Sequence, residues 1–155
     1  MSTEFADNII RVDRSVRPSY PYWIKTVIHP ELEKIGPSKY DISLVKQWLH
    51  KDQKNGRCIR GNKIYTHFKV TDTLKTCLGL RDLEEIQKKG IVFFREHFQC
   101  KAVFGWKSVL WDSNGNLNVP YLHEDGGSVV IRWKWLDSDW NDGNPALRIA
   151  SSSQR

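Results

Sequence analysis

Hydrophobic residues in the first hundred positions recur mainly at intervals of three and four, which is the period of an amphipathic helix. The longest such stretch, Leu83–Phe98, predicts a central helix. Gly90 lies inside it, and glycine costs a helix about 1 kcal/mol relative to alanine, so we expect either a break or a close packing contact there. Ile64 and Phe68 are expected to turn inward from a shorter helix. These shorter helices are predicted over residues 31–35, 44–49, 63–69 and 71–78.

From Lys101 onward the period changes to two, which is typical of half-buried β-strands. Pro120 cannot donate to a strand ladder, so its strand is expected at an edge or at a bulge. Trp133 and Trp135 share one face of the last strand and are expected to pack on the central helix. Strands are predicted over residues 103–111, 118–122 and 128–136, with turns at 112–115 and 125–127. The predicted fold class is therefore α+β, with several N-terminal helices packed on a C-terminal three-stranded antiparallel meander.

The length of 155 residues fits one domain. We expect a flexible N-terminal arm over residues 1–20, a single α+β domain over 21–150 and a loose tail over 151–155. The arm lacks the apolar run of a signal peptide, and no segment approaches the roughly 20 apolar residues that span a bilayer. The three cysteines are an odd number at wide spacing, unlike a secreted disulfide framework. The sequence thus predicts a cytoplasmic protein with free thiols and no membrane partner.

The net charge of +6 is concentrated in one segment of the chain. Residues 46–69 contain seven basic side chains and a single acidic one, Asp52, which accounts for the whole surplus. Clustered basic charge is typical of a phosphate-binding surface, because each neutralised phosphate releases counterions. Turn signals at Asn55-Gly56 and Gly61-Asn62 place this charge on an exposed connection between two helices. A solvated loop that serves only solubility is the simpler alternative. The predicted nucleic-acid-binding residues are Lys51, Lys54, Arg57, Arg60 and Lys63.

Acidic residues near the C-terminus indicate a second kind of chemistry. Asp137 and Asp139, together with His123, could form the catalytic site of a metal-dependent phosphodiesterase, since paired carboxylates can bring magnesium to a phosphate. The segment does not fit a calcium loop, because its twelfth position is Arg148 instead of glutamate. A turn stabilised by Asp and Asn side chains over residues 137–143 is the structural alternative. No cofactor motif is present, and we predict no resident metal or cofactor.

Aromatic residues suggest two further binding modes. Tryptophans on a sheet can stack on the bases of single-stranded nucleic acid while lysine and arginine follow the backbone. Exposed aromatic residues at Tyr20–Trp23 or on the sheet would instead serve a protein–protein interaction module. The sheet residues suited to base stacking are Trp106, Trp111, Trp133 and Trp135, beside Lys107, Arg132 and Lys134.

The end of the chain resembles the ending of a group of small uncharacterised bacterial proteins. The resemblance is carried by the run Trp133-Lys134-Trp135-Leu136-Asp137-Ser138-Asp139-Trp140, followed by Asn144-Pro145, and covers mainly the C-terminal third. It implies a bacterial or phage origin and identifies no active residue.

These patterns favour a small, basic, tryptophan-rich and non-catalytic protein that binds nucleic acid or another polyanion through the loop from Lys51 to Lys63. Two alternatives stay open at this point. One is a protein–protein interaction module of bacterial or phage origin, and the other is the metal-dependent phosphodiesterase.

Overall fold

The computed structural model describes residues 7–149, and its centre is a mixed sheet of seven strands. The long strand β8 pairs with β7 and then β6 along one side and with β9 along the other. From β6 the sheet continues through parallel β11 to antiparallel β4, and β2 closes the opposite end against β7. The strands are β2 (Ile24–Val27), β4 (Lys46–Trp48), β6 (Val103–Phe104), β7 (Leu110–Asp112), β8 (Leu117–Asp125), β9 (Ser128–Trp135) and β11 (Ala146–Arg148).

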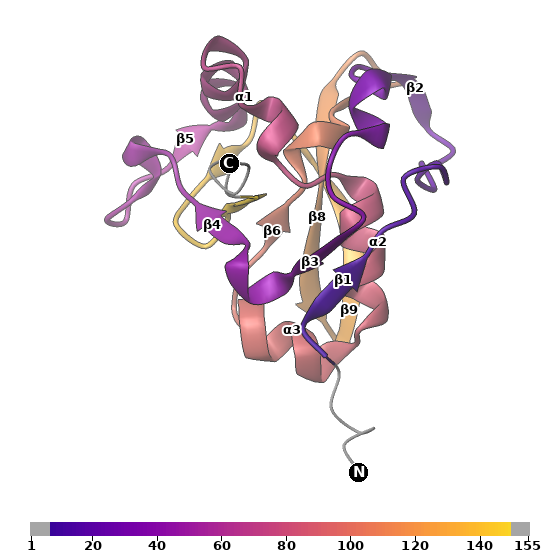
Figure 1. Ribbon diagram of the computed structural model, residues 1–155. Coiled ribbons are helices and arrows are strands. Elements are labelled where there is room, and N and C mark those ends of the chain that lie inside the picture. The colour runs from indigo at the N-terminus through magenta and orange to yellow at the C-terminus, as the bar shows by residue number, and fades with distance from the viewer. Residues whose placement is uncertain (1–6, 150–155) are drawn as a thin grey trace.

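Two small antiparallel ladders and three helices complete the fold (Figure 1). Strand β1 (Ile9–Arg11) pairs with β3 (Lys39–Asp41), and β5 (Ile59–Arg60) pairs with β10 (Asp139–Trp140). The α-helices are α1 (Gly61–Val70), α2 (Leu80–Lys88) and α3 (Ile91–Phe98). Short 3₁₀ turns are η2 (Pro30–Lys34), η3 (Ile42–Leu44), η4 (Lys51–Gln53), η5 (Leu74–Thr76) and η6 (Trp106–Ser108).

The predicted fold class, N-terminal helices on a three-stranded meander, is wrong. The β7–β8–β9 part of the sheet does run antiparallel in sequence order, but four further strands extend it. Residues 44–49, predicted as helix, contain β4 because Lys46–Trp48 pair with β11, about a hundred positions away along the chain. A local hydrophobic period cannot show such a distant partner. The predicted strand 103–111 is likewise divided into β6 and β7 by η6.

Pro120 lies inside the central strand and not at an edge of the sheet. On one side of β8, residues 117–118 pair with β7 and residues 121–122 pair with β6, and Pro120 lies between these two pairings, where η6 interrupts the neighbouring chain. No strand hydrogen bond from an N–H is therefore needed at residue 120 on that side. Its carbonyl oxygen still accepts from the Gly105 N–H at 3.0 Å. The hairpin from β8 to β9 turns at Gly126–Gly127, both with positive φ, as a two-residue turn requires.

The helix predicted over 83–98 is two helices, because Gly90 adopts a φ of +94° and ends the first. Helix α1 confirms the prediction over 63–69, with Ile64 and Phe68 at 1% and 0% exposure. The helix predicted over 31–35 is the five-residue 3₁₀ turn η2, and the helix predicted over 71–78 shortens to the 3₁₀ turn η5.

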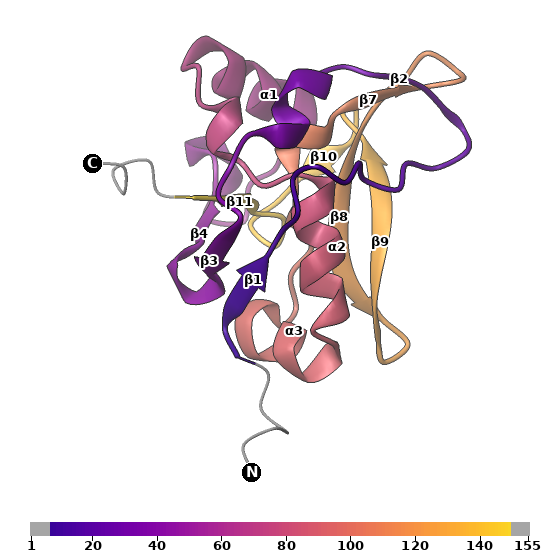
Figure 2. The same cartoon turned by 45° about the vertical axis from the view of Figure 1, so that its right-hand side comes forward.

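The sheet separates two hydrophobic cores. On one face, Val103 and Leu122 pack with α2, α3 and β1; on the other, Phe104 and Trp140 pack with α1 and η5. Alternation along the strands sends neighbouring residues such as Val103 and Phe104 to opposite cores. Figure 2 shows α2 running along β8 and β9, with α1 at the other end of the molecule from α3.

Within the N-terminal arm predicted over residues 1–20, Ile9–Arg11 form β1 and Ile10 is fully buried. The loose tail predicted over 151–155 lies outside the described residues. Among residues 7–149, no helix is long and apolar enough to cross a membrane.

A buried group of charges attaches the N-terminal segment to α2. The Asp82 carboxylate, which is fully buried, accepts from the Arg14 guanidinium at 3.1 and 3.0 Å, from the Tyr40 hydroxyl at 2.7 Å and from the Gly79 N–H at 2.9 Å. The buried Lys107 lies beside this group, and burial lowers the pKa of its ammonium to about 8 although the Asp82 charge opposes the shift. The group is structural, since the Asp82 oxygens are occupied by protein donors.

Candidate nucleic-acid interface

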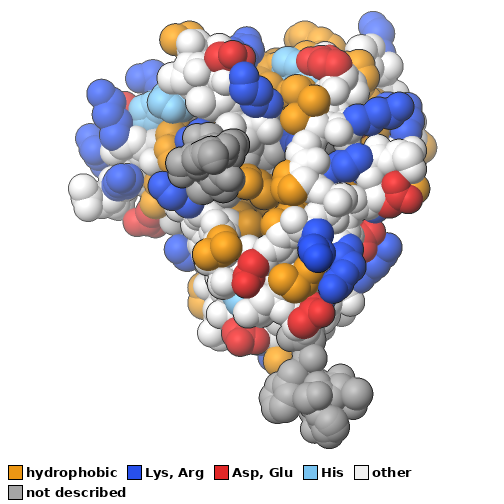
Figure 3. All heavy atoms as spheres, viewed as in Figure 1, with side chains coloured by type: hydrophobic (Ala, Val, Ile, Leu, Met, Phe, Trp, Pro, Cys, Tyr) orange, Lys and Arg blue, Asp and Glu red, His pale blue; other side chains and the backbone are white. Residues whose placement is uncertain are grey.

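The basic residues of the loop between β4 and α1 lie together on one surface. We call this surface the basic face; it is visible as the dense group of blue side chains on the left of Figure 3. All six of its side chains are exposed. They are Lys46, Lys51, Lys54, Arg57, Arg60 and Lys63.

Most of the charge on the basic face has no carboxylate partner. Among the described residues, Lys51, Lys54 and Lys63 have no carboxylate oxygen within 4.0 Å. Arg57 reaches Asp52 only at 3.9 Å, and Arg60 reaches the exposed Asp139 at 3.7 Å. Exposed pairs at such distances contribute little, so the face keeps a strong positive potential.

Although its residues are exposed, the loop of the basic face is fixed to the body of the protein. The buried Gln53 side chain donates to the carbonyl oxygens of Asn141 and Asn144 at 2.8 and 2.9 Å. At the start of η4, the His50 ring accepts from the Asp52 N–H at 3.0 Å while the Gln53 side chain accepts from the His50 N–H. The sequence places these positive charges on a turn, and the structure holds that turn in one conformation.

Helix α1 begins where the chain passes tightly over the second core. A Cβ added to Gly61 would lie 2.5 Å from the Trp140 ring, so only glycine fits this first helical position. Gly61 thus lies directly against Trp140, next to the β5–β10 ladder in which Arg60 pairs with Asp139. The first turn of α1 starts from this contact. Lys63 and His67, four residues apart, therefore share the helix face that looks onto the basic face.

Lys46 of the basic face has another cationic residue as its cross-strand partner, and the Arg148 Nε–H of that partner donates to the Thr76 hydroxyl at 3.1 Å. In the β4–β11 ladder, Lys46 pairs with Arg148, and both side chains lie on the same sheet face as Trp48. The Arg148 guanidinium is 5.7 Å from the centre of the Trp48 ring and 5.4 Å from that of Phe68. Like charges directly opposite destabilise a strand pair. An arrangement of this kind is stabilised when an anion lies between the two cations.

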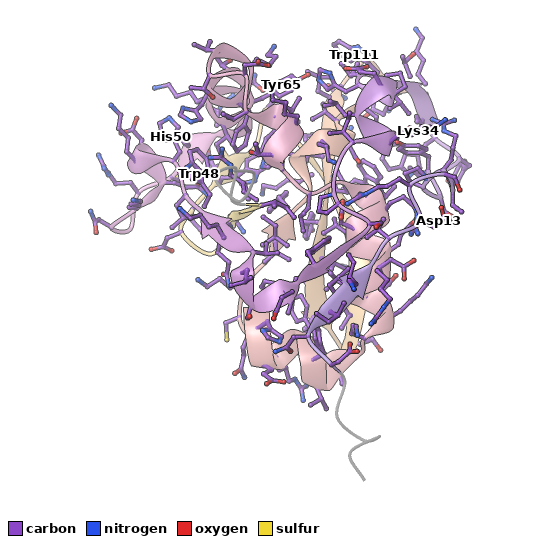
Figure 4. All side chains as sticks on the ribbon, viewed as in Figure 1. Asp13, Lys34, Trp48, His50, Tyr65 and Trp111 are labelled. Atoms are coloured by element: carbon purple, nitrogen blue, oxygen red, sulfur yellow. The ribbon has the colours of Figure 1, made fainter. Side chains whose placement is uncertain are left out.

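Aromatic rings accompany these cations. The rings of Trp48 and His67 stack with centres 4.9 Å apart, and the His50 ring meets His67 edge-on at 5.7 Å. Burial lowers the pKa of His67, and the nearby Arg148 adds to the effect. Burial also lowers the pKa of His50, with the charges of Lys51 and Lys63 contributing in the same direction against Asp52. Both rings are consequently neutral at pH 7. Figure 4 shows Trp48 and His50 on the side of the molecule that carries the basic face.

The residues of the alternative phosphodiesterase site belong to separate environments. His123 lies on β8 and lines a cavity with Glu124 and Asn141, whereas Asp137 accepts from the Asn62 amide and Asp139 faces Arg60. Across residues 7–149, no group of three or more His, Cys, Asp or Glu side chains is arranged to hold a metal. The structure therefore does not bring these three residues together.

The tryptophans of the sheet differ from one another in exposure. Trp106 is fully buried and cannot stack on a base, and Trp133 packs edge-on against Trp23 with ring centres 5.7 Å apart. The prediction that Trp135 packs on the central helix is wrong, because its side chain is 54% exposed at the end of β9. Trp111 is 38% exposed on β7.

Trp48, His50, His67 and Arg148 are functional candidates that the sequence analysis missed. The cluster joins β4, the following loop, α1 and β11, so it depends on the pairing of distant segments. The one local signal was the four-residue interval between Lys63 and His67 on a helix already predicted. Comparison with protein families, curated proteins and solved structures finds no match to this chain, so its function has to be inferred from its own side chains.

Proposed function

We propose that the protein binds nucleic acid, without catalysis, through the basic face and the aromatic cluster beside it. The observation that carries the proposal is the Lys46–Arg148 pair: two cationic residues that are cross-strand partners next to Trp48, with no carboxylate oxygen within 4.0 Å of either among residues 7–149. A phosphate between these cations would relieve their repulsion.

The neighbouring residues extend this contact along a strand of phosphates. Lysines act as point charges toward a backbone, and Arg57 and Arg60 offer planar donors suited to phosphate oxygens. Arg57 is already oriented by donating to the carbonyl oxygens of Lys51 and Lys54, at 3.0 and 3.4 Å. Such contacts position a nucleic acid without reading its sequence.

Replacing Lys54, Arg57 and Arg60 together with alanine should weaken binding to a random single-stranded oligonucleotide about tenfold or more near 0.1 M salt. The slope of log K against log salt should also become shallower by about two to three, since each lost phosphate contact removes about 0.7 to 0.9 from it. Fluorescence anisotropy at several salt concentrations measures both quantities.

The matched control carries the same loss of charge elsewhere on the surface. Lys34, Lys39 and Lys88 are exposed and lie on η2, β3 and α2, away from the basic face. Their triple alanine variant should bind nearly as the original protein does. Equal loss in the two variants would mean that only the net charge matters and would contradict a defined binding face.

Binding should strengthen as the pH falls below 6.5, the ordinary pKa of histidine. His50 and His67 have lowered pKa values and are neutral at pH 7, whereas a bound phosphate favours their charged forms. Proton uptake is then coupled to binding, and by linkage the affinity rises with acidity. The double variant His50→Gln with His67→Gln should lose this rise in anisotropy titrations between pH 5 and 8 while retaining its salt slope. A rise that persists in the double variant would rule out these histidines as its source.

A further inference from the structure

Two exposed tryptophans form the walls of one small cavity. Its volume is about 240 Å³, roughly that of eight water molecules, which suits a single heterocyclic base. Trp111 and Trp135 are 38% and 54% exposed at this point, and both line the same cavity. The cavity is lined by Asn62, Trp111, Asn116, Leu117, Trp135 and Asp137.

The hairpin that carries one wall of this cavity is rigid. The buried Asp112 carboxylate accepts from the N–H groups of Asn114 and Asn116 at 2.9 Å each and from the Asn118 amide at 3.0 Å. Burial opposes ionisation, but these bonds and one from the Trp135 side chain lower the pKa of Asp112. The Asp112 carboxylate therefore holds both the turn after Trp111 and the Trp135 side chain before any ligand arrives.

The polar edge of the cavity offers mainly hydrogen-bond acceptors. The Asn62 Nδ2 donates to Asp137 Oδ1 at 3.0 Å, which leaves Asn62 Oδ1 and Asp137 Oδ2 directed to other partners. A carboxylate has no donor, so this bond also settles the orientation of the Asn62 amide. Two neighbouring acceptors match a ligand edge with two neighbouring donors, as guanine has in its ring N–H and its amino group.

This cavity adjoins the basic face. Asn62 stands between Arg60 and Lys63 in the sequence, and the Gly61 N–H donates to the Ser138 carbonyl at 3.2 Å, next to Asp137. In Figure 4, Trp111 lies to the right of Tyr65 of α1, whereas Trp48 and His50 lie to the left. A nucleic-acid strand whose phosphates lie on the basic face would therefore run past the N-terminus of α1 to reach the cavity.

We infer that the cavity between Trp111 and Trp135 takes one unpaired base of a single-stranded nucleic acid, with guanine preferred. This inference rests on the proposed function, which supplies nucleic acid as the class of ligand. Trp111 and Trp135 start from opposite faces of the sheet, so each offers the base a separate stacking contact at the end of the strands, and Asp137 with Asn62 accepts hydrogen bonds from the base edge. A base inside a duplex cannot enter such a cavity, so single strands are the preferred form.

Strands of twelve abasic residues, carrying one central guanine, one central adenine or no base, test this inference by anisotropy. Stacking is worth about 1 to 3 kcal/mol per base, so the strand with one guanine should bind about fivefold or more tightly than the strand with none. Trp135→Ala and Trp111→Ala should each remove most of that advantage while keeping the salt slope. Asp137→Asn should reduce the preference for guanine over adenine. Tyr22→Ala, which removes a 98% exposed aromatic ring outside the cavity, is the matched control and should change nothing.

Failure of the inference can be distinguished from failure of the proposed function. Steep salt-dependent binding with equal affinity for all three strands would overturn the base cavity and leave the basic face in place. Guanosine monophosphate provides the separate probe, because a base stacked on indole rings quenches tryptophan fluorescence. Quenching that Trp135→Ala abolishes, without binding of any strand, would support the cavity and contradict the proposed function. If guanosine monophosphate causes no quenching and no strand binds, both proposals are contradicted. If neutral maltohexaose quenches the fluorescence and guanosine monophosphate does not, the assignment of the cavity to a base is overturned.

Discussion

Asp82→Ala is expected to lower the free energy of unfolding by about 3–5 kcal/mol, the cost of breaking a buried ion pair from one side. The fully buried carboxylate accepts four hydrogen bonds, two of them from Arg14. Without it, the Arg14 guanidinium and the buried Lys107 ammonium lie near each other with no carboxylate oxygen of residues 7–149 within 4.0 Å. The variant also removes the side chain that caps the first turn of α2 by accepting from the Gly79 N–H.

Urea unfolding followed by tryptophan fluorescence measures this loss. Asp142→Ala is the matched control, because Asp142 is exposed in the loop before β11 and such positions usually change stability by less than about 0.5 kcal/mol. Asp82→Asn, which keeps the shape and part of the hydrogen bonding, should fall between the two. An Asp82→Ala variant as stable as the Asp142→Ala control would contradict a stabilising role for the buried group of charges.

Trp140→Ala is expected to lower the free energy of unfolding by about 3–5 kcal/mol, because a large buried side chain loses its packing contacts. The Trp140 ring is fully buried between Phe104 and Trp106, with ring centres 5.2 and 5.6 Å away, and it covers Gly61 at the start of α1. Its indole N–H has no acceptor among the described residues, so the loss is one of contacts and not of a hydrogen bond. The cavity left behind would also loosen the β5–β10 ladder that holds Arg60.

The same substitution at Trp135 provides the comparison. Trp135 is half exposed but bonds the buried Asp112 carboxylate, so Trp135→Ala should lower the free energy of unfolding by about 1–2 kcal/mol, less than Trp140→Ala does. Urea midpoints of the two variants test the difference, and equal losses would contradict the burial that separates these two tryptophans. A stable Trp135→Ala variant is also what makes its binding measurements interpretable.

Part of the candidate interface could be predicted from the sequence. The basic segment, its turn signals and the inward face of α1 are all local, and the structure shows Lys51 to Lys63 exposed on a fixed loop. The rest of the interface could not be predicted. Arg148 meets Trp48 only because β11 pairs with β4, and the polar edge of the base cavity forms only because Asn62 meets Asp137 from 75 positions away along the chain.

The sequence by itself determined the local elements whose hydrophobic period is strong: α1, the hairpin at Gly126–Gly127 and the alternating strand β9. At Gly90 it left a helix break and a close packing contact as alternatives, and the structure has the break. Only the tertiary structure decided the sheet. Short segments such as Lys46–Trp48 have too few residues for a period of their own and become strands through a distant partner. The exposure of Trp135 was decided in the same way, because alternation assigns a side chain to a face of the sheet, and only the packed neighbours determine how much of that face is covered.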